Sequence, residues 1–114
     1  MKIDRSLLSG SISLMVLSLL AERDQYGYQI ISELARRSDN TFALKEGTLY
    51  PVLHTLENDK RVISYTREAE NGRVRKYYRI TNCGLELLRQ KTEEWLRFSE
   101  KVNQVVLGPT ASMA

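Results

Sequence analysis

The dipeptide Asn71-Gly72 constrains the fold of this chain more than any other local feature. It lies between two strand-like segments, Val62–Ala69 and Arg73–Ile80. Asparagine followed by glycine favours the two-residue type I′ turn, whose backbone twist suits a β-hairpin. The second segment alternates between two faces, one formed by Val74, Lys76, Tyr78 and Ile80 and the other by Arg73, Arg75, Tyr77 and Arg79. We therefore predict a hairpin over residues 62–80.

Three helices are predicted before the hairpin, and the first of them, Ser6–Ala21, has apolar residues on two faces. One face carries Leu8, Ile12, Met15, Val16 and Leu19, and the other carries Leu7, Leu14, Leu17 and Ala21. A helix that is apolar on two faces is buried on two sides. We expect one side to pack in the core of the domain and the other against a partner subunit.

The second and third predicted helices are joined by a short polar turn. After a polar loop at Glu22–Gln25, the second helix covers Tyr26–Arg37 and leads into the turn at Ser38–Thr41. The third helix lies within Lys45–Asp59 and buries a narrow stripe formed by Leu49, Val52, Leu53 and Leu56. Pro51 is unfavourable inside a helix. The pattern alone leaves open whether this helix begins at the start of that range or at Pro51.

A long helix is predicted after the hairpin. Thr81 is a suitable N-cap, the helix runs to about Leu107, and Gly108-Pro109 ends it. Three-and-four spacing, with polar interruptions, relates Leu85, Leu88, Thr92, Trp95, Ser99, Val102 and Val106. Because so long a helix has little of its own chain to pack against, we expect it to join two copies into a homodimer. Thr110–Ala114 is expected to form a loose tail.

This order of elements predicts a mainly α protein with a small β-hairpin, namely a winged helix-turn-helix followed by a long C-terminal dimerisation helix. We expect residues 1–81 to form a DNA-binding domain, residues 82–107 the dimerisation helix and residues 108–114 a flexible tail. A chain of 114 residues is long enough for one such domain and too short for a separate effector domain.

Positive charge is concentrated in the segment that contains the hairpin. Residues 60–81 have seven basic and two acidic residues, a net charge of +5, whereas residues 1–59 carry −2 and residues 82–114 are neutral. A local excess of positive charge of this kind is typical of a surface that binds a polyanion.

Two further features bear on the compartment. Cys83 is the single cysteine, so no intramolecular disulfide is possible, which suits a reducing compartment. The apolar run Ile12–Ala21 is too short for a membrane span, and Leu19 stands where a signal-peptide cleavage site needs a small residue. We therefore expect a cytoplasmic protein that does not associate with membranes.

Three segments of the sequence resemble the PadR-like transcriptional regulators, in particular the short subfamily with one C-terminal dimerisation helix. They are Tyr26–Ile30, Glu46–Leu53 and Gly72–Thr81, the last followed by Gly84. The resemblance implies a homodimeric repressor that binds a palindromic operator and is released by small effectors. It also implies that Pro51 lies inside the recognition helix, which would then start near Lys45.

The third helix and the hairpin supply the predicted contacts to double-stranded DNA. The face of the helix opposite its apolar stripe has hydrogen-bonding groups and few charges, which suits readout of base edges in the major groove. An ordinary solvated face would be richer in lysine and glutamate. Hairpin cations would neutralise backbone phosphates. The predicted DNA-binding residues are Lys45, Gly47, Thr48, Tyr50, Pro51, His54, Thr55, Arg73, Arg75 and Lys76.

Trp95 is the candidate effector-binding residue, with Leu14, Met15 and Leu88 lining the same region if the first and last helices pack together. The resemblance implies this role, because a multidrug-responsive lactococcal member of the family stacks flat aromatic drugs on a tryptophan of this helix. The alternative is that Trp95 is only an aromatic residue of the dimer core.

No other chemistry is indicated by the sequence. His54 has no cysteine or aspartate at metal-ligand spacing, and no nucleophile–base set or phosphate-binding loop is present, so we expect neither metal, cofactor nor enzymatic activity. Cys83 lies in the first turn of the last predicted helix, where the helix dipole favours a thiolate. The alternative function is a winged-helix module that binds another protein and does not contact DNA.

Overall fold

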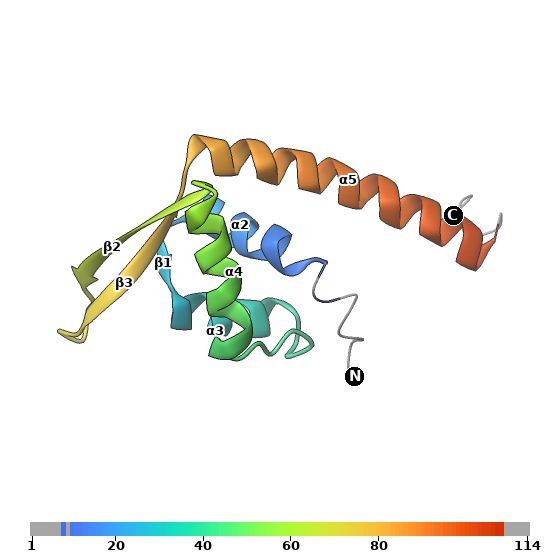
Figure 1. Ribbon diagram of the computed structural model, residues 1–114. Coiled ribbons are helices and arrows are strands. Elements are labelled where there is room, and N and C mark those ends of the chain that lie inside the picture. The colour runs from blue at the N-terminus through green and yellow to red at the C-terminus, as the bar shows by residue number, and fades with distance from the viewer. Residues whose placement is uncertain (1–7, 9, 109–114) are drawn as a thin grey trace.

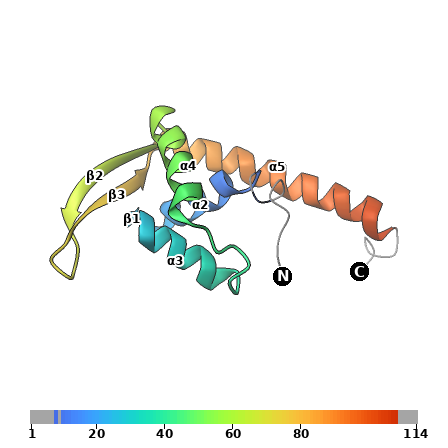
Figure 2. The same ribbon diagram turned by 60° about the horizontal axis from the view of Figure 1, so that its bottom comes forward.

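The computed structural model describes residue 8 and residues 10–108, in which three helices form a compact body between two projecting elements (Figures 1 and 2). The hairpin projects from one end of the body and the C-terminal half of the last helix from the other. The described elements are α2 (Ile12–Glu22), β1 (Gln25–Tyr26), α3 (Gly27–Arg37), α4 (Glu46–Asn58), β2 (Val62–Glu68), β3 (Val74–Ile80) and α5 (Asn82–Leu107). The predicted fold class, mainly α with a small β-hairpin, is confirmed.

A single hydrophobic core lies where α2, α3 and α4 meet the base of the sheet. Leu17, Ile30, Leu49 and Leu53 are completely buried in it, and Tyr78 reaches it from β3. The amphipathic pattern of each helix therefore faces this core, which fixes how the three helices lie relative to the hairpin.

The first predicted helix, Ser6–Ala21, is interrupted between Leu8, which is helical, and Ile12. A turn at Gly10-Ser11 precedes α2, and the Ser11 N–H donates to the Leu8 carbonyl at 2.9 Å. Glycine loses more conformational entropy in a helix than other residues, which favours a break there. The expected start at Ser6, with Leu7, lies outside the described residues.

The second predicted apolar face of this helix is buried only in part within the described chain. Leu17 is completely buried, and α2 packs against α5. Ala21, which was expected on the second face, is exposed. The expectation that this face needs a partner subunit was therefore wrong for Leu17, because the long helix folds back across α2.

The prediction of a loop at Glu22–Gln25 was wrong for Gln25, because Gln25 and Tyr26 form the third strand of the sheet. The strand order is β1-β3-β2, with Gln25 opposite Tyr78 and Tyr26 opposite Tyr77. Gln25 is buried, and its Nε2 donates to the Leu19 carbonyl at 3.0 Å. A strand of two residues is too short to show an alternating pattern in sequence.

The third predicted helix is continuous through Pro51. It is α4, with Lys45 as N-cap, so the alternative start at Pro51 was wrong. Proline cannot donate the helical bond to the carbonyl four residues earlier. That carbonyl belongs to Gly47, which is exposed, so water satisfies it at little cost.

The hairpin prediction is confirmed, but its turn is of another type. The Ala69 N–H donates to the Arg73 carbonyl at 2.7 Å, which closes a three-residue loop. Gly72 has a φ of 81°, whereas Asn71 does not have the positive φ that a type I′ turn requires. Asn71 Oδ1 instead accepts a hydrogen bond from the Arg73 N–H at 3.1 Å, so the side chain stabilises the longer loop.

The start of α5 is fixed against the segment before the hairpin. Thr81 is its N-cap, as predicted, because Thr81 Oγ1 accepts a hydrogen bond from the Gly84 N–H at 3.0 Å. A Cβ at Gly84 would lie 2.1 Å from the Arg61 carbonyl oxygen, so only glycine permits this approach. The helix ends at Leu107 before Gly108, as predicted, while Pro109 and the expected tail lie outside the described residues.

Candidate nucleic-acid interface

One side of α4 is buried and the other is open to solvent. Leu49, Leu53 and Leu56 fix the helix to the core. The seven residues predicted for base or phosphate contact are all exposed on the open side: Lys45, Gly47, Thr48, Tyr50, Pro51, His54 and Thr55. The structure thus brings the helical part of the predicted site onto one surface, which carries hydroxyl and imidazole groups and little charge.

Tyr50 also joins two helices. A Cβ built on Gly27, the first residue of α3, would lie 2.3 Å from the Tyr50 hydroxyl oxygen. The tyrosine therefore crosses the beginning of α3 while keeping 40% of its surface exposed. This position holds α3 and α4 together and leaves the phenol at the edge of the open side of α4.

The hairpin cations lie on two faces, as the predicted alternation requires. We call β2, β3 and the loop between them the wing. Lys76 Nζ lies 3.8 Å from Glu57 Oε1 of α4, and the Ser64 hydroxyl also donates to Glu57. Lys76 therefore faces α4, whereas Arg75, the preceding residue of β3, belongs to the opposite face.

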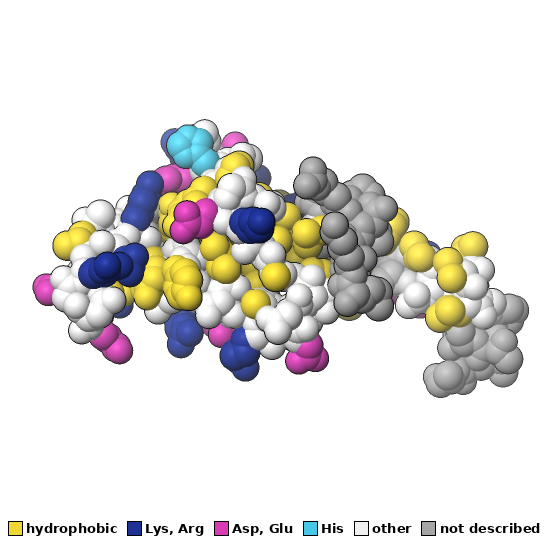
Figure 3. All heavy atoms as spheres, turned by 90° about the horizontal axis from the view of Figure 1, so that it is seen from below, with side chains coloured by type: hydrophobic (Ala, Val, Ile, Leu, Met, Phe, Trp, Pro, Cys, Tyr) yellow, Lys and Arg dark blue, Asp and Glu magenta, His cyan; other side chains and the backbone are white. Residues whose placement is uncertain are grey.

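The opposite face of the wing combines arginine with tyrosine. At the end of the molecule that bears the wing, Figure 3 shows basic side chains beside hydrophobic ones. The Arg67 guanidinium lies 4.3 Å from the centre of the Tyr77 ring, and that of Arg75 lies 5.2 Å from the centre of the Tyr26 ring. A hydrogen bond to the Tyr77 hydroxyl raises the pKa of Arg67 above its ordinary value. Both arginines are thus preorganised on aromatic surfaces rather than freely mobile in solvent.

A third arginine on this face is neutralised. Arg79 Nη2 lies 2.9 Å from Asp24 Oδ2, and the Tyr65 hydroxyl donates to the same carboxylate. Burial by itself raises the pKa of Asp24, but the hydrogen bonds from Tyr65 and Arg79 outweigh it and the pKa lies below its ordinary value. Arg79 therefore serves to attach the segment before β1 to the wing.

Arg67 is the wing residue that the prediction of the site missed. It belongs to the positively charged segment of residues 60–81, which was a usable signal. Its position directly opposite Arg75 could not be read from the sequence, because the register of two strands depends on the turn that joins them.

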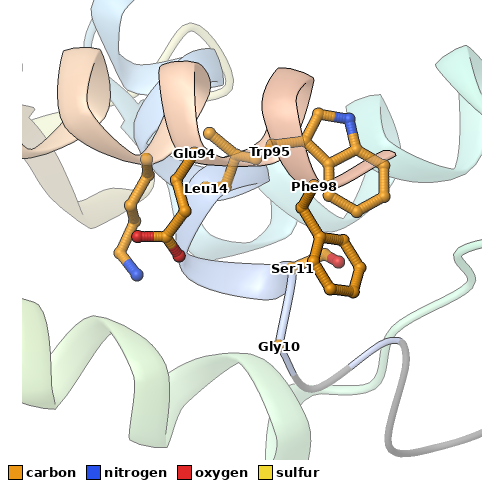
Figure 4. Close-up of a pocket in the computed structure, with 7 residues that line it drawn as sticks. Gly10, Ser11, Leu14, Glu94, Trp95 and Phe98 are labelled. Carbon is orange, nitrogen blue, oxygen red and sulfur yellow. The ribbon is translucent and has the colours of Figure 1, made fainter. Parts of the chain in front are cut away.

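Trp95 lines an open cleft of about 280 Å³ between α5 and the start of α2 (Figure 4). Leu14 lines it as predicted, together with five residues that the sequence did not single out: Gly10, Ser11, Lys91, Glu94 and Phe98. The Trp95 and Phe98 ring centres are 6.4 Å apart.

Two of the residues predicted for this region are not part of the cleft. Met15 and Leu88 instead pack against the hydrophobic core. Their helical spacing was compatible with either position, because it does not show which of two neighbouring surfaces a side chain meets.

In the described part of the chain, no group of three or more histidine, cysteine or acidic side chains is arranged to hold a metal ion. No helix among the described residues is both long and apolar enough to cross a membrane.

Three helices, a wing and an open recognition-helix face define a winged helix-turn-helix protein. Comparison with known proteins identifies the family within this class. The sequence model of the transcriptional regulator PadR-like family matches residues 16–90. The chain belongs to this family and is a transcriptional regulator.

Relatives of known sequence and structure agree with this assignment. The transcriptional regulator Rv3488 of Mycobacterium tuberculosis is 34% identical over 98 residues, which cover 86% of this chain and 84% of the relative. A transcriptional regulator from Clostridium thermocellum superposes with a TM-score of 0.83 at 36% identity, covering 91% of this chain and 98% of the other. A PadR-like regulator from Bacillus cereus gives a TM-score of 0.80 at 28% identity, covering 90% and 98%.

Proposed function

We propose that this regulator is a homodimeric repressor that binds a palindromic DNA operator through α4 and the wing. The observation that carries the proposal is the open side of α4, where seven exposed residues with few charges lie on a helix that is fixed to the core by its other side. An α-helix fits the major groove, and threonine and histidine can meet base edges there. Lys45, at the beginning of the helix, would contact phosphate.

The wing would supply affinity that does not depend on base sequence. Arg73 is exposed and has no ion pair among the described residues, so it is available to a phosphate. Lys76 is close to Glu57 and would exchange this weak, exposed contact for a phosphate. Arg75 would contribute from the other face of the wing.

Dimerisation would cover the apolar surface of α5. The C-terminal half of this helix exposes seven large apolar side chains: Trp95, Leu96, Phe98, Val102, Val105, Val106 and Leu107. Isolated exposed apolar residues are common, but a continuous set along one projecting helix is typical of a protein interface. Residues 82–107 would thus form the dimerisation helix and residues 1–81 the DNA-binding domain, with α4 of each subunit reaching successive major grooves about 34 Å apart.

A planar aromatic effector is proposed to bind beside Trp95. The support is the cleft itself, which offers two aromatic rings and the apolar side chain of Leu14. Binding there would release the operator only if the effector binds more tightly to an arrangement of the subunits in which the two α4 helices no longer match the spacing of the half-sites.

Selection of duplexes from a random pool tests the DNA proposal. We expect the selected sequences to contain two inverted half-sites one helical turn apart, which would report the symmetry and spacing of the dimer together. Affinity for the selected duplex should fall steeply as salt rises, because phosphate contacts release counterions. Absence of duplex binding at low salt would contradict the proposal and favour a protein-binding module.

A further inference from the structure

The wing projects from the body of the molecule and is joined to it at its base (Figure 1). β1 pairs with β3 only at Tyr77 and Tyr78, so the loop end of the wing extends beyond the third strand of the sheet. On the side of α4, Glu57 accepts a hydrogen bond from the Ser64 hydroxyl and lies 3.8 Å from Lys76 Nζ. This ion pair is long and partly exposed, and such pairs contribute little. Contacts on the other face are therefore needed to fix the direction of the wing.

Asp24 supplies such a contact on the other face. It lies between the end of α2 and the start of β1, and its Oδ2 accepts hydrogen bonds from Arg79 Nε at 3.0 Å and from the Tyr65 hydroxyl. Tyr65 belongs to β2 and Arg79 to β3, so one carboxylate holds both strands of the wing. Only 25% of the Asp24 side chain is exposed, so water competes less for these bonds than it would at an open surface.

Three aromatic rings extend this attachment from Asp24 to the helices. Tyr65 stacks on Tyr77 with ring centres 5.8 Å apart, and Tyr77 meets Tyr26 edge to face with ring centres 5.3 Å apart. Tyr26 is the N-cap of α3, the helix whose first residue lies against Tyr50 of α4. Paired aromatic rings have preferred geometries, so this series of contacts relates the direction of the wing to that of α4.

We propose that Asp24 is a positioning residue for DNA binding, which sets the direction of the wing relative to α4 through Tyr65 and Arg79 without itself contacting the duplex. The proposal rests on the DNA-binding function proposed above. A wing that already has the required direction favours binding, because apparent affinity falls with the fraction of molecules in the competent arrangement. Without this role, removal of the negative charge of Asp24 would strengthen binding to a polyanion. The two expectations have opposite signs, which makes them distinguishable.

Affinity for the selected duplex tests the sign of the effect. Asp24→Ala should weaken binding about fivefold or more, although it removes a negative charge. Tyr65→Phe, which removes only the hydroxyl and leaves the net charge unchanged, should also weaken binding. The dependence of affinity on salt should stay that of the wild type in both variants, because the cations that neutralise phosphates are retained. The matched control Asp59→Ala removes an exposed carboxylate at the end of α4 that has no ion pair in the described chain, and should bind at least as tightly as the wild type.

NMR relaxation of the backbone amides in the free protein tests the attachment itself. We expect amides at the loop end of the wing to become more mobile in Asp24→Ala and Tyr65→Phe, while those of α4 and α5 keep their wild-type values. The proposal is overturned if the mobility of the wing is unchanged in both variants, or if the variants, folded as judged by their amide spectra, bind the duplex as tightly as Asp59→Ala does. Failure of the wild type to bind any duplex would instead contradict the operator proposal. The relaxation measurement contains no DNA, so the two failures are distinct.

Discussion

At the scale of single residues, Gly84 and Gly47 show how much the surroundings of a glycine decide its role. Both lie in helices, where glycine is less favourable than alanine by about 1 kcal/mol. A Cβ at Gly84 would collide with the Arg61 carbonyl, whereas a Cβ at Gly47 would meet nothing within 4 Å. Packing therefore requires glycine at position 84. No neighbour requires it at position 47, which lies on the surface proposed to contact DNA.

We predict opposite effects of the same substitution at these two positions. Gly84→Ala should lower the free energy of unfolding by about 2 kcal/mol, because the neighbouring atom is backbone and cannot move away easily. Gly47→Ala should leave it unchanged or raise it by about 0.5 kcal/mol through helix propensity. Urea unfolding at one protein concentration measures both. Similar values for the two variants would show that the close approach at Gly84 is not important for stability.

At the scale of elements, an ion pair joins the end of α3 to the end of α2. Arg37 of α3 pairs with Glu22 at the end of α2 and, at 2.9 Å, with Glu33 of its own helix. Hydrogen bonds from Arg36 and Arg37 lower the pKa of Glu33 to about 2. The charged form of Glu33 is thus favoured in the folded state.

This lowered pKa gives a prediction about pH. A carboxyl whose pKa is lower when folded contributes stability above its ordinary pKa of 4.5 and loses that contribution as pH falls toward about 2. Glu33→Gln should therefore be less stable than the wild type at neutral pH, and the difference should shrink between pH 4.5 and 2. Thermal unfolding across this range measures it. The control Glu100→Gln, at an exposed position without an ion pair in the described chain, should leave the stability at neutral pH nearly unchanged.

At the scale of the whole molecule, α5 and the wing are the two elements that extend beyond the core (Figure 1). The overall dimensions of 55 × 31 × 22 Å reflect this projection. The wing carries charge at its surface, and the far half of α5 carries apolar side chains. This division places the proposed DNA contact and the proposed subunit contact on different parts of the molecule.

Two exposed valines provide a matched test of the dimer. Val106 on α5 is 71% exposed and Val74 on the wing is 72% exposed. We predict that Val106→Asp shifts the equilibrium toward monomer, because a buried interface would have to accommodate a charge. Val74→Asp should leave the subunit equilibrium unchanged. Sedimentation equilibrium measures the association constants, and equal effects of the two substitutions would argue against a dimer formed by α5.

The substitution Trp95→Ala distinguishes the two roles considered for Trp95, namely effector binding and a structural role in the dimer interface. If Trp95 stacks an effector, the variant should bind the selected duplex as the wild type does and lose most of its response to a planar aromatic compound that does not itself bind duplex DNA. Fluorescence anisotropy of labelled duplex, with and without the aromatic compound, measures both properties. Conversion of the variant to monomers would instead show that Trp95 is a structural residue of the interface.

The sequence by itself determined the number, order and type of the larger elements, because each has a local cause. Helical periodicity placed α3 and α4, Thr81 marked the start of α5, and the Asn71-Gly72 pair located the hairpin. The same periodicity identified the open side of α4. Only the tertiary structure decided the strand at Gln25–Tyr26, the packing of α5 on α2 and the alignment of Arg67 with Arg75. These features join residues distant in the chain, and their energies come from contacts that form only when the core has assembled.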